Sequence, residues 1–126
     1  MAEIYVIGVD AGTESMRAGV FDLTGTVIAE GVTPIATRFP QAGWAEQSPE
    51  EWWQALGSSV RQAVTNAKIR PDQIVGLAAD TTCCTVVALD AQGRSLRPAI
   101  IWMDMRAAPQ AARIAALDDP ALKVNN

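Results

Sequence analysis

The residues from Asp10 to Arg17 have the types and spacing of a phosphate-binding turn. An apolar run ends at Asp10, and Gly12 and Thr13 follow at once, so backbone N–H groups and a hydroxyl meet at one bend. Arg17 adds a guanidinium, and the Asp10 carboxylate is placed to hold Mg²⁺ directly or through water. The alternative is an ordinary hairpin in which Asp10 and Thr13 satisfy turn amides.

Asp80, Thr81 and Thr82 form a second polar group, at the end of the apolar run 74–79. The arrangement repeats the one at Asp10, because an apolar run is again followed by an aspartate and then by threonine. These residues could bind a ligand at the end of a strand, or they could be polar positions in a turn or a sheet. Their spacing leaves both interpretations open.

Trp102, Asp104 and Arg106 form a third group, between an apolar run and an alanine-rich segment. A carboxylate and a guanidinium can hydrogen-bond the neighbouring hydroxyls of a polyol, while an indole covers its C–H face. In the alternative interpretation Asp104 is a helix N-cap and Arg106 is a solvated surface charge.

The composition excludes several other kinds of site. The chain has 126 residues, 49% of them hydrophobic, and a net charge of −4, which predicts one globular domain or a piece of one and no nucleic-acid partner. It has no histidine, which excludes Ser-His-Asp and Cys-His nucleophiles and histidine-ligated zinc. The P-loop, G-x-G-x-x-G and G-x-S-x-G motifs are also absent.

The two cysteines and the first residues of the chain indicate the cellular compartment of the protein. Cys83 and Cys84 are adjacent, so a disulfide between them would not cross-link separate parts of the chain. We therefore expect both to be small apolar side chains in a buried strand. Glu3 stands where a signal peptide would be basic, and acidic residues interrupt each apolar run well before it could cross a membrane. The sequence therefore predicts a cytoplasmic protein with no membrane partner.

The pattern of apolar runs predicts a mixed α/β fold. Runs at 4–9, 17–22 and 26–30 are joined by short turns and are expected to be antiparallel neighbours, because a parallel crossover needs a dozen or more residues. Residues 33–43 look irregular. Further strands are expected at 74–79, 84–89 and 98–102, and a final helix is expected to reach about Leu117.

The best-marked element is a helix that follows Ser48. Ser48 is a suitable N-cap, Pro49 suits the first helical position, and Glu51 completes a capping-box pattern. An apolar stripe follows at helical spacing, and we expect it to pack in the core rather than hold a cofactor. The stripe comprises Trp53, Leu56, Val60, Val64 and Ala67, with Trp52 and Ala63 alongside.

In this order, the motifs resemble the N-terminal part of the FGGY family of carbohydrate kinases, within the sugar kinase/Hsp70/actin superfamily. Residues 7–13 with Arg17 are similar to the family's phosphate-binding hairpin. Residues 43–47, together with the helix that begins at Pro49, are similar to the family's next signature. Residues 74–82 are similar to its sugar-site strand, and 102–106 to its W-x-D-x-R segment. The resemblance implies a ribonuclease H-like fold with an antiparallel start, here as an incomplete first domain.

The resemblance also implies ATP-dependent phosphorylation of a sugar or polyol, with Mg²⁺ as cofactor. Asp10 would hold Mg²⁺ through water, and Gly12, Thr13 and Arg17 would bind the ATP phosphates. The residues implied in the sugar pocket are Thr81, Thr82, Trp102, Asp104 and Arg106. Glu14 departs from the Thr or Ser that often follows the Gly-Thr pair.

Within the family, Asp80-Thr81-Thr82 is more similar to ribulokinases and related ketopentose kinases. The Arg-Glu pair usual in glycerol kinases and the Gln-Met-His set of xylulokinases are both absent. A ketopentose such as ribulose is therefore the expected substrate. Xylulose, glycerol and erythritol are the alternatives.

Family members are several times longer, so the resemblance implies that residues 1–126 are the N-terminal part of the first, sugar-binding domain. The general base and the adenosine pocket would lie downstream, so we expect the chain alone to be inactive. One alternative is a non-catalytic module that binds sugar, or a partner chain, without phosphorylating anything. Another is a regulator of the same superfamily that lacks kinase activity. In each case strands that would meet the rest of the domain are exposed, and we expect self-association or a homo-oligomer through them.

Overall fold

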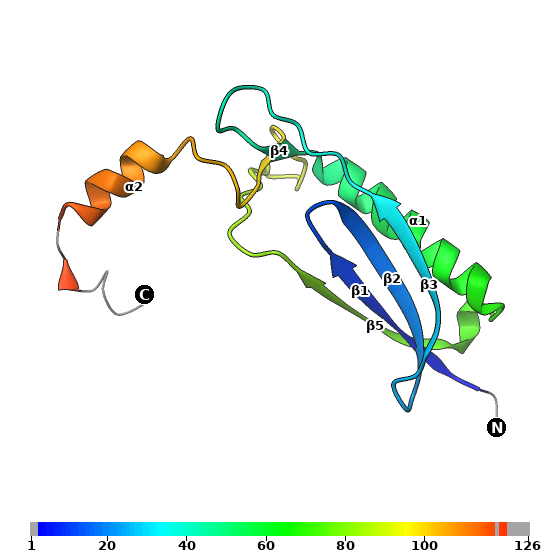
Figure 1. The fold of residues 1–126 in the computed structure, drawn as a ribbon. Coiled ribbons are helices and arrows are strands. Elements are labelled where there is room, and N and C mark those ends of the chain that lie inside the picture. The colour runs from blue at the N-terminus through cyan, green and yellow to red at the C-terminus, as the bar shows by residue number, and fades with distance from the viewer. Residues whose placement is uncertain (1–2, 118, 121–126) are drawn as a thin grey trace.

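The computed structural model describes residues 3–117 and 119–120, and its main body is a four-stranded mixed sheet covered by one long helix (Figure 1). The strand order is β3-β2-β1-β5. The strands β1 (Tyr5–Ala11), β2 (Ser15–Asp22) and β3 (Val27–Pro34) are antiparallel, and β5 (Ile74–Thr81) is parallel to β1. The predicted α/β fold with three antiparallel opening strands is therefore confirmed.

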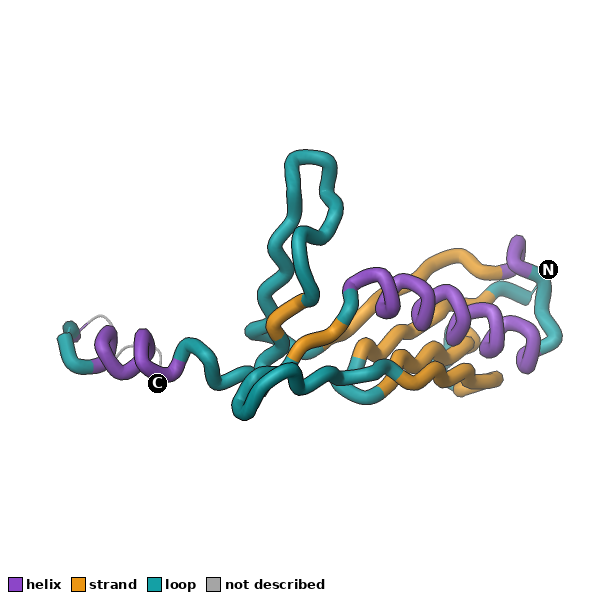
Figure 2. The backbone as a smooth tube through the Cα atoms, turned by 90° about the horizontal axis from the view of Figure 1, so that it is seen from above, coloured by secondary structure: helices purple, strands orange, loops and turns teal. Residues whose placement is uncertain are grey.

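The helix α1 (Pro49–Ala67) lies across one face of the sheet, above β2 and β3 (Figure 2). It begins where the sequence predicts, since Ser48 Oγ accepts a hydrogen bond from Glu51 N at 3.4 Å. The Glu51 carboxylate does not complete the capping box but pairs with Arg38. The helix ends at Lys68, whose φ of 55° is left-handed, and the 3₁₀ turn η1 (Pro71–Gln73) leads into β5.

The contact between α1 and the sheet is close, and small residues make it possible. Val20, Ser59 and Ala63 are fully buried there. Ser59 Oγ donates a hydrogen bond to the Met16 carbonyl at 2.8 Å, which satisfies the only buried hydroxyl at this contact within the described residues. A Cβ on Gly31 of β3 would lie 2.2 Å from the Ser59 carbonyl oxygen, so only glycine fits there.

The predicted helix stripe is right except for Trp53, which is 75% exposed. The most buried positions of α1 are Ala55, Ser59 and Ala63. Trp52 precedes Ala55 by three residues and shares its face, whereas Trp53 precedes it by two and points to the opposite side. Trp52 therefore packs against the core in place of Trp53.

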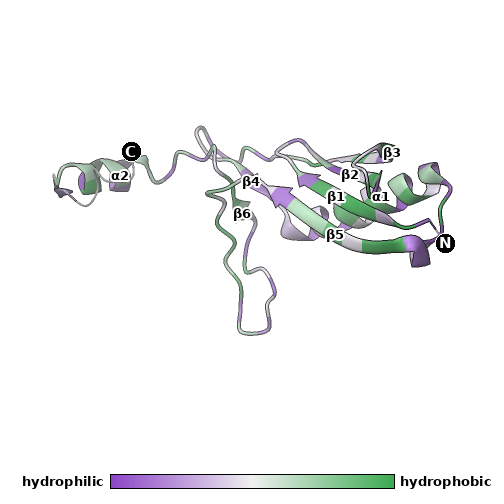
Figure 3. Ribbon diagram, turned by 90° about the horizontal axis from the view of Figure 1, so that it is seen from below, coloured by the Kyte–Doolittle hydropathy of each residue, from purple (hydrophilic) through white to green (hydrophobic). Residues whose placement is uncertain are grey.

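The segment after β5 is less regular than predicted. The expected strand at 84–89 is not formed, and only the single bridges Val86–Ile100 and Leu89–Ser95 lie in this region. Cys83 and Cys84 are exposed rather than buried, and Cys84 has a φ of 63°, which a continuing strand cannot adopt. The loop extends away from the sheet before β6 (Figure 3).

The last predicted strand, 98–102, is reduced to β6 (Ala99–Ile100), which pairs with β4 (Glu46–Gln47). The helix α2 (Ala108–Ala115) is shorter than predicted and lies apart from the sheet (Figures 1 and 2). Neither α1 nor any other helix in the described residues has the length and apolar character needed to cross a membrane.

The strand β5 was expected to be buried but is largely exposed, with Val75 at 58% and Leu77 at 55%. Within the described residues its only neighbour in the sheet is β1. Its first half is hydrophobic and its end, at Asp80 and Thr81, is hydrophilic (Figure 3). Self-association through this edge stays a prediction.

Candidate functional site

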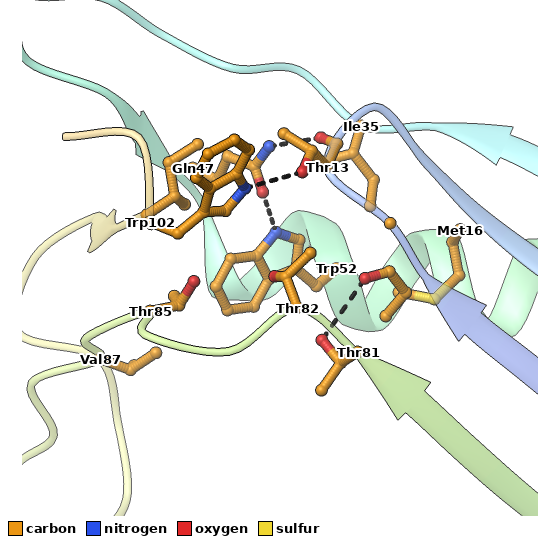
Figure 4. A pocket seen from close by; sticks show the side chains of 13 residues that line it. Thr13, Met16, Ile35, Gln47, Trp52, Thr81, Thr82, Thr85, Val87 and Trp102 are labelled. Atoms are coloured by element: carbon orange, nitrogen blue, oxygen red, sulfur yellow. Dashed lines mark hydrogen bonds between the residues drawn. The ribbon is translucent and has the colours of Figure 1, made fainter. Parts of the chain in front are cut away.

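A pocket of about 280 Å³ lies at the carboxyl ends of β1 and β5 (Figure 4). It brings together residues from three of the sequence motifs. Gly12 and Thr13 come from the turn between β1 and β2, Thr81 and Thr82 from the end of β5 and the residue after it, and Trp102 from the segment after β6. The β1–β5 register, which pairs Ala11 with Thr81, places the first two groups side by side.

The rest of the pocket wall is apolar or neutral. Its apolar members are Ala11, Met16, Ile35, Trp52, Val87 and Ile101, and its polar members are Gln47 and Thr85. No charged side chain is among the described residues that line it. Threonine hydroxyls and indole rings in one cavity can hydrogen-bond hydroxyl groups and cover C–H surfaces, so the pocket suits an uncharged polyhydroxylated ligand.

Thr13 is held from two sides. The side-chain amide of Gln47 donates to the Thr13 carbonyl oxygen at 2.7 Å, and Trp102 Nε1 donates to Thr13 Oγ1 at 3.0 Å. Both contacts are drawn in Figure 4. The turn between β1 and β2 is thereby tied to β4 and to the segment after β6.

Gln47 and Trp52 were not identified as site residues from the sequence. Gln47 is 3% exposed, and its amide also donates to Thr37 Oγ1 at 2.7 Å and accepts from Trp52 Nε1 at 2.8 Å. The available signal was a glutamine directly before the helix cap at Ser48, inside the segment similar to a family signature. Nothing in that pattern shows that its partners lie 34 residues away, at Thr13.

Asp10 and Arg17 lie on the other face of the sheet. Alternation along β1 turns Tyr5, Ile7 and Val9 toward α1 and therefore turns Asp10 away from it. Asp10 pairs with Arg17 at 3.0 Å, and both side chains are more than half exposed. They line a shallow depression beside Phe21 rather than the pocket.

The surroundings of Asp10 suit Mg²⁺ only when other ligands are present. No cluster of three metal-ligating side chains exists in the part of the chain that the structure describes. Asp10 would thus be a single protein ligand, with Asp80 opposite it in the β1–β5 register. Mg²⁺ is commonly held in this way, by one or two carboxylates together with water and substrate phosphates.

Asp104 and Arg106 form an internal ion network instead of lining the pocket. Arg106 donates to the Asp104 carboxylate at 2.7 and 2.8 Å and to Glu46 at 2.8 Å, and its guanidinium lies 3.8 Å from the centre of the Trp44 ring. The side chains of Asp104 and Glu46 are 2% and 10% exposed. Asp104 also accepts from the Ala45 backbone N–H at 2.7 Å.

These contacts fix the charge states. Hydrogen bonds from Arg106 and from the Ala45 N–H hold the pKa of Asp104 well below its ordinary value, against the opposing effect of desolvation. The hydrogen bond to Asp104 raises the pKa of Arg106 in turn. The network clamps residues 101–106 against 43–46, and two further backbone bonds, Ile101 N to Ala45 O and Met105 N to Gly43 O, reinforce it.

Asp10 and Asp104, which the resemblance assigns to Mg²⁺ and to the sugar pocket, therefore do not face one groove. Asp10 lies on the sheet face away from α1, and Asp104 lies inside the clamp that supports the Trp102 segment. The shared pocket is formed by the Gly12–Thr13 turn, the Thr81–Thr82 pair and Trp102.

Comparison with known proteins shows the family to which the chain belongs. Residues 5–125 match the family model for the N-terminal domain of the FGGY family of carbohydrate kinases. Among curated relatives, a glycerol kinase of Thermococcus gammatolerans is 34% identical over 112 residues, and glycerol kinase 2 of Sulfolobus acidocaldarius is 39% identical over 110 residues. These alignments cover 89% and 86% of this chain but only 23% and 22% of the relatives.

Solved structures lead to the same family. The xylulose kinase of Rhodospirillum rubrum matches with a TM-score of 0.80 and 32% identity, over 89% of this chain and 23% of that one. A kinase of Brucella ovis described as a xyloylose kinase matches with a TM-score of 0.82 and 27% identity, over 89% of this chain and 24% of that one. The chain thus spans about a quarter of the length of the proteins it matches, and it belongs to the FGGY family of carbohydrate kinases.

Proposed function

We propose that this chain supplies the sugar-binding part of an enzyme that transfers the γ-phosphoryl group of ATP to a hydroxyl of an uncharged ketose or polyol. The observation that carries the proposal is the neutral pocket of Figure 4, which lies directly beside the Gly12–Thr13 turn. Thr82 offers a hydroxyl that can donate to and accept from sugar hydroxyls, and Thr81, whose proton is donated to the Ala11 carbonyl at 3.4 Å, offers an acceptor. Trp102 is 54% exposed and offers an indole face to the sugar C–H groups.

The turn between β1 and β2 is proposed to bind the phosphates of ATP. The N–H of Gly12 is hydrogen-bonded to the Ser15 carbonyl at 3.0 Å. The donors proposed for the phosphates are therefore the Thr13 hydroxyl, on the pocket side of the sheet, and the Arg17 guanidinium, on its other face. Mg²⁺, held by Asp10 through water, would neutralise phosphate charge. Phosphoryl transfer depends on positioning and on charge stabilisation around the γ-phosphate. The general base and the adenosine site are proposed to lie in the remainder of the enzyme.

Asp104 and Arg106 receive a different role in this proposal. Their side chains are already engaged in the network with Glu46 and Trp44, so they support the Trp102 segment rather than contact the sugar. Recognition then rests on neutral groups, which favours an uncharged sugar over a sugar acid.

Ribulose is the proposed substrate, on the similarity of Asp80-Thr81-Thr82 to ketopentose kinases. The relatives named as glycerol and xylulose kinases make glycerol and xylulose the substrates to compare with it. Two short threonine side chains suit a ligand larger than glycerol, because they leave the pocket open.

The test is sugar-dependent release of ADP by the full-length enzyme that contains this chain, supplied with MgATP and with ribulose, xylulose, glycerol or gluconate in turn. We expect the highest kcat/KM with ribulose and at least about a hundredfold lower kcat/KM with gluconate, whose carboxylate would be buried without a partner. The 126-residue chain alone should release no ADP. Activity confined to glycerol or gluconate, or ADP release independent of any sugar, would contradict the proposal.

A further inference from the structure

Thr13 is contacted by two residues of the pocket, the exposed Trp102 and the buried Gln47, and this arrangement suggests more than binding. We propose that Trp102 serves both substrates: its indole face contacts the sugar, and its N–H orients the Thr13 hydroxyl toward an ATP phosphate, so that one hydrogen bond couples the two binding events. The inference rests on the proposed function and adds a positioning role for Trp102.

The direction of that hydrogen bond follows from the chemistry of the two groups. An indole N–H can only donate, whereas a hydroxyl has one proton to donate and two lone pairs that accept. Trp102 Nε1 therefore donates to Thr13 Oγ1, at 3.0 Å. The Thr13 proton stays available for another acceptor, and phosphate oxygens are acceptors.

The backbone of Thr13 is fixed by a separate contact. Gln47 holds the Thr13 carbonyl at 2.7 Å, and its remaining amide groups are used by Thr37 and Trp52. Since Gln47 is 3% exposed and fully bonded, it has no freedom to respond to a ligand. The orientation of the Thr13 hydroxyl therefore depends on Trp102.

Trp102 is the part of this arrangement that can respond to sugar. It is more than half exposed, and its polar contact with the turn between β1 and β2 is the bond to Thr13. A sugar placed on its face restricts the ring and with it the Thr13 hydroxyl, so phosphate binds more tightly. By linkage, phosphate must tighten sugar binding by the same factor.

The experiment measures this coupling in the full-length enzyme. Calorimetry gives the Kd of β,γ-methylene-ATP with Mg²⁺, without and with saturating ribulose. For the wild type we expect ribulose to tighten the analogue by about fivefold or more. For Trp102→Phe, which keeps an aromatic face but lacks the N–H donor, we expect the analogue to bind with nearly the same Kd whether or not ribulose is present.

A matched control is Trp53→Phe, the same change at an exposed tryptophan of α1, and it should keep the wild-type coupling. A circular dichroism spectrum and a melting temperature like those of the wild type show that Trp102→Phe is folded. Coupling that persists in Trp102→Phe, or that is lost equally in Trp53→Phe, would overturn the inference. If the wild type binds neither ribulose nor the analogue, the proposed function itself fails.

Discussion

Gly31→Ala is expected to destabilise the protein by about 3 kcal/mol, an unusually large effect for the addition of one methyl group. The Cβ would lie 2.2 Å from the Ser59 carbonyl oxygen and 2.8 Å from the Ala63 nitrogen. Both atoms belong to the backbone of α1, so no side chain can move aside. Relief requires the helix to shift from β3, which opens the core around Val20. Urea denaturation followed by circular dichroism measures the loss.

The matched control is Gly76→Ala in β5. A Cβ at Gly76 meets only Val6 Cγ1, at an ordinary 3.9 Å, so the free energy of unfolding should change by less than about 0.5 kcal/mol. Equal urea midpoints for the two variants would show that α1 does not pack against β3 as described.

Arg106→Met is expected to lower the melting temperature by about 10 °C, because it removes two side-chain hydrogen bonds from the buried Asp104 carboxylate and one from Glu46, which keeps Arg97 as its remaining ion partner. Asp104 and Glu46 would stay in place with their carboxylates 2% and 10% exposed. The comparison is Arg113→Met on α2, where the arginine is exposed and the change should leave the melting temperature within about 2 °C. Similar losses for both variants would contradict the network's role.

The acid dependence of this difference follows from Asp104. The hydrogen bond from Arg106 holds the pKa of Asp104 below the value it has in the unfolded chain. The network therefore stabilises the fold fully above the ordinary carboxyl pKa of about 4, and that contribution is lost as the pH falls further. We expect the melting temperatures of wild type and Arg106→Met to converge below about pH 4 in differential scanning calorimetry. A constant difference would exclude Asp104 as the group responsible.

Elements whose signals are local could be predicted from the sequence. Turns too short for a crossover determined the antiparallel start, and the cap at Ser48 determined the first turn of α1. Where two positions carried the same signal, the pattern failed. Trp52 and Trp53 both fit a helical stripe, and only the position of the sheet beneath Ala55 decides between them.

In the pocket too, residues with local signals could be predicted, whereas roles that depend on distant contacts could not. Gly12, Thr81 and Trp102 were singled out by type and position, and the structure brings their segments together. Asp104 and Arg106 were singled out too, but a carboxylate and a guanidinium suit an internal ion pair as well as a polyol. The choice depends on Glu46, which lies 60 residues from Arg106, so no residue close to Asp104 in the sequence indicates it.

The pairing of β5 with β1 has a consequence for the order in which the chain folds. Contacts at the two ends of this pair, from Gln73 to Glu3 and from Thr81 to Ala11, join residues 70 positions apart, whereas β1, β2 and β3 are linked by turns. Closing the larger loop costs more chain entropy before any contact compensates for it. The hairpins and α1 should therefore assemble first, and the wall of the pocket that carries Thr81 and Thr82 should be completed late.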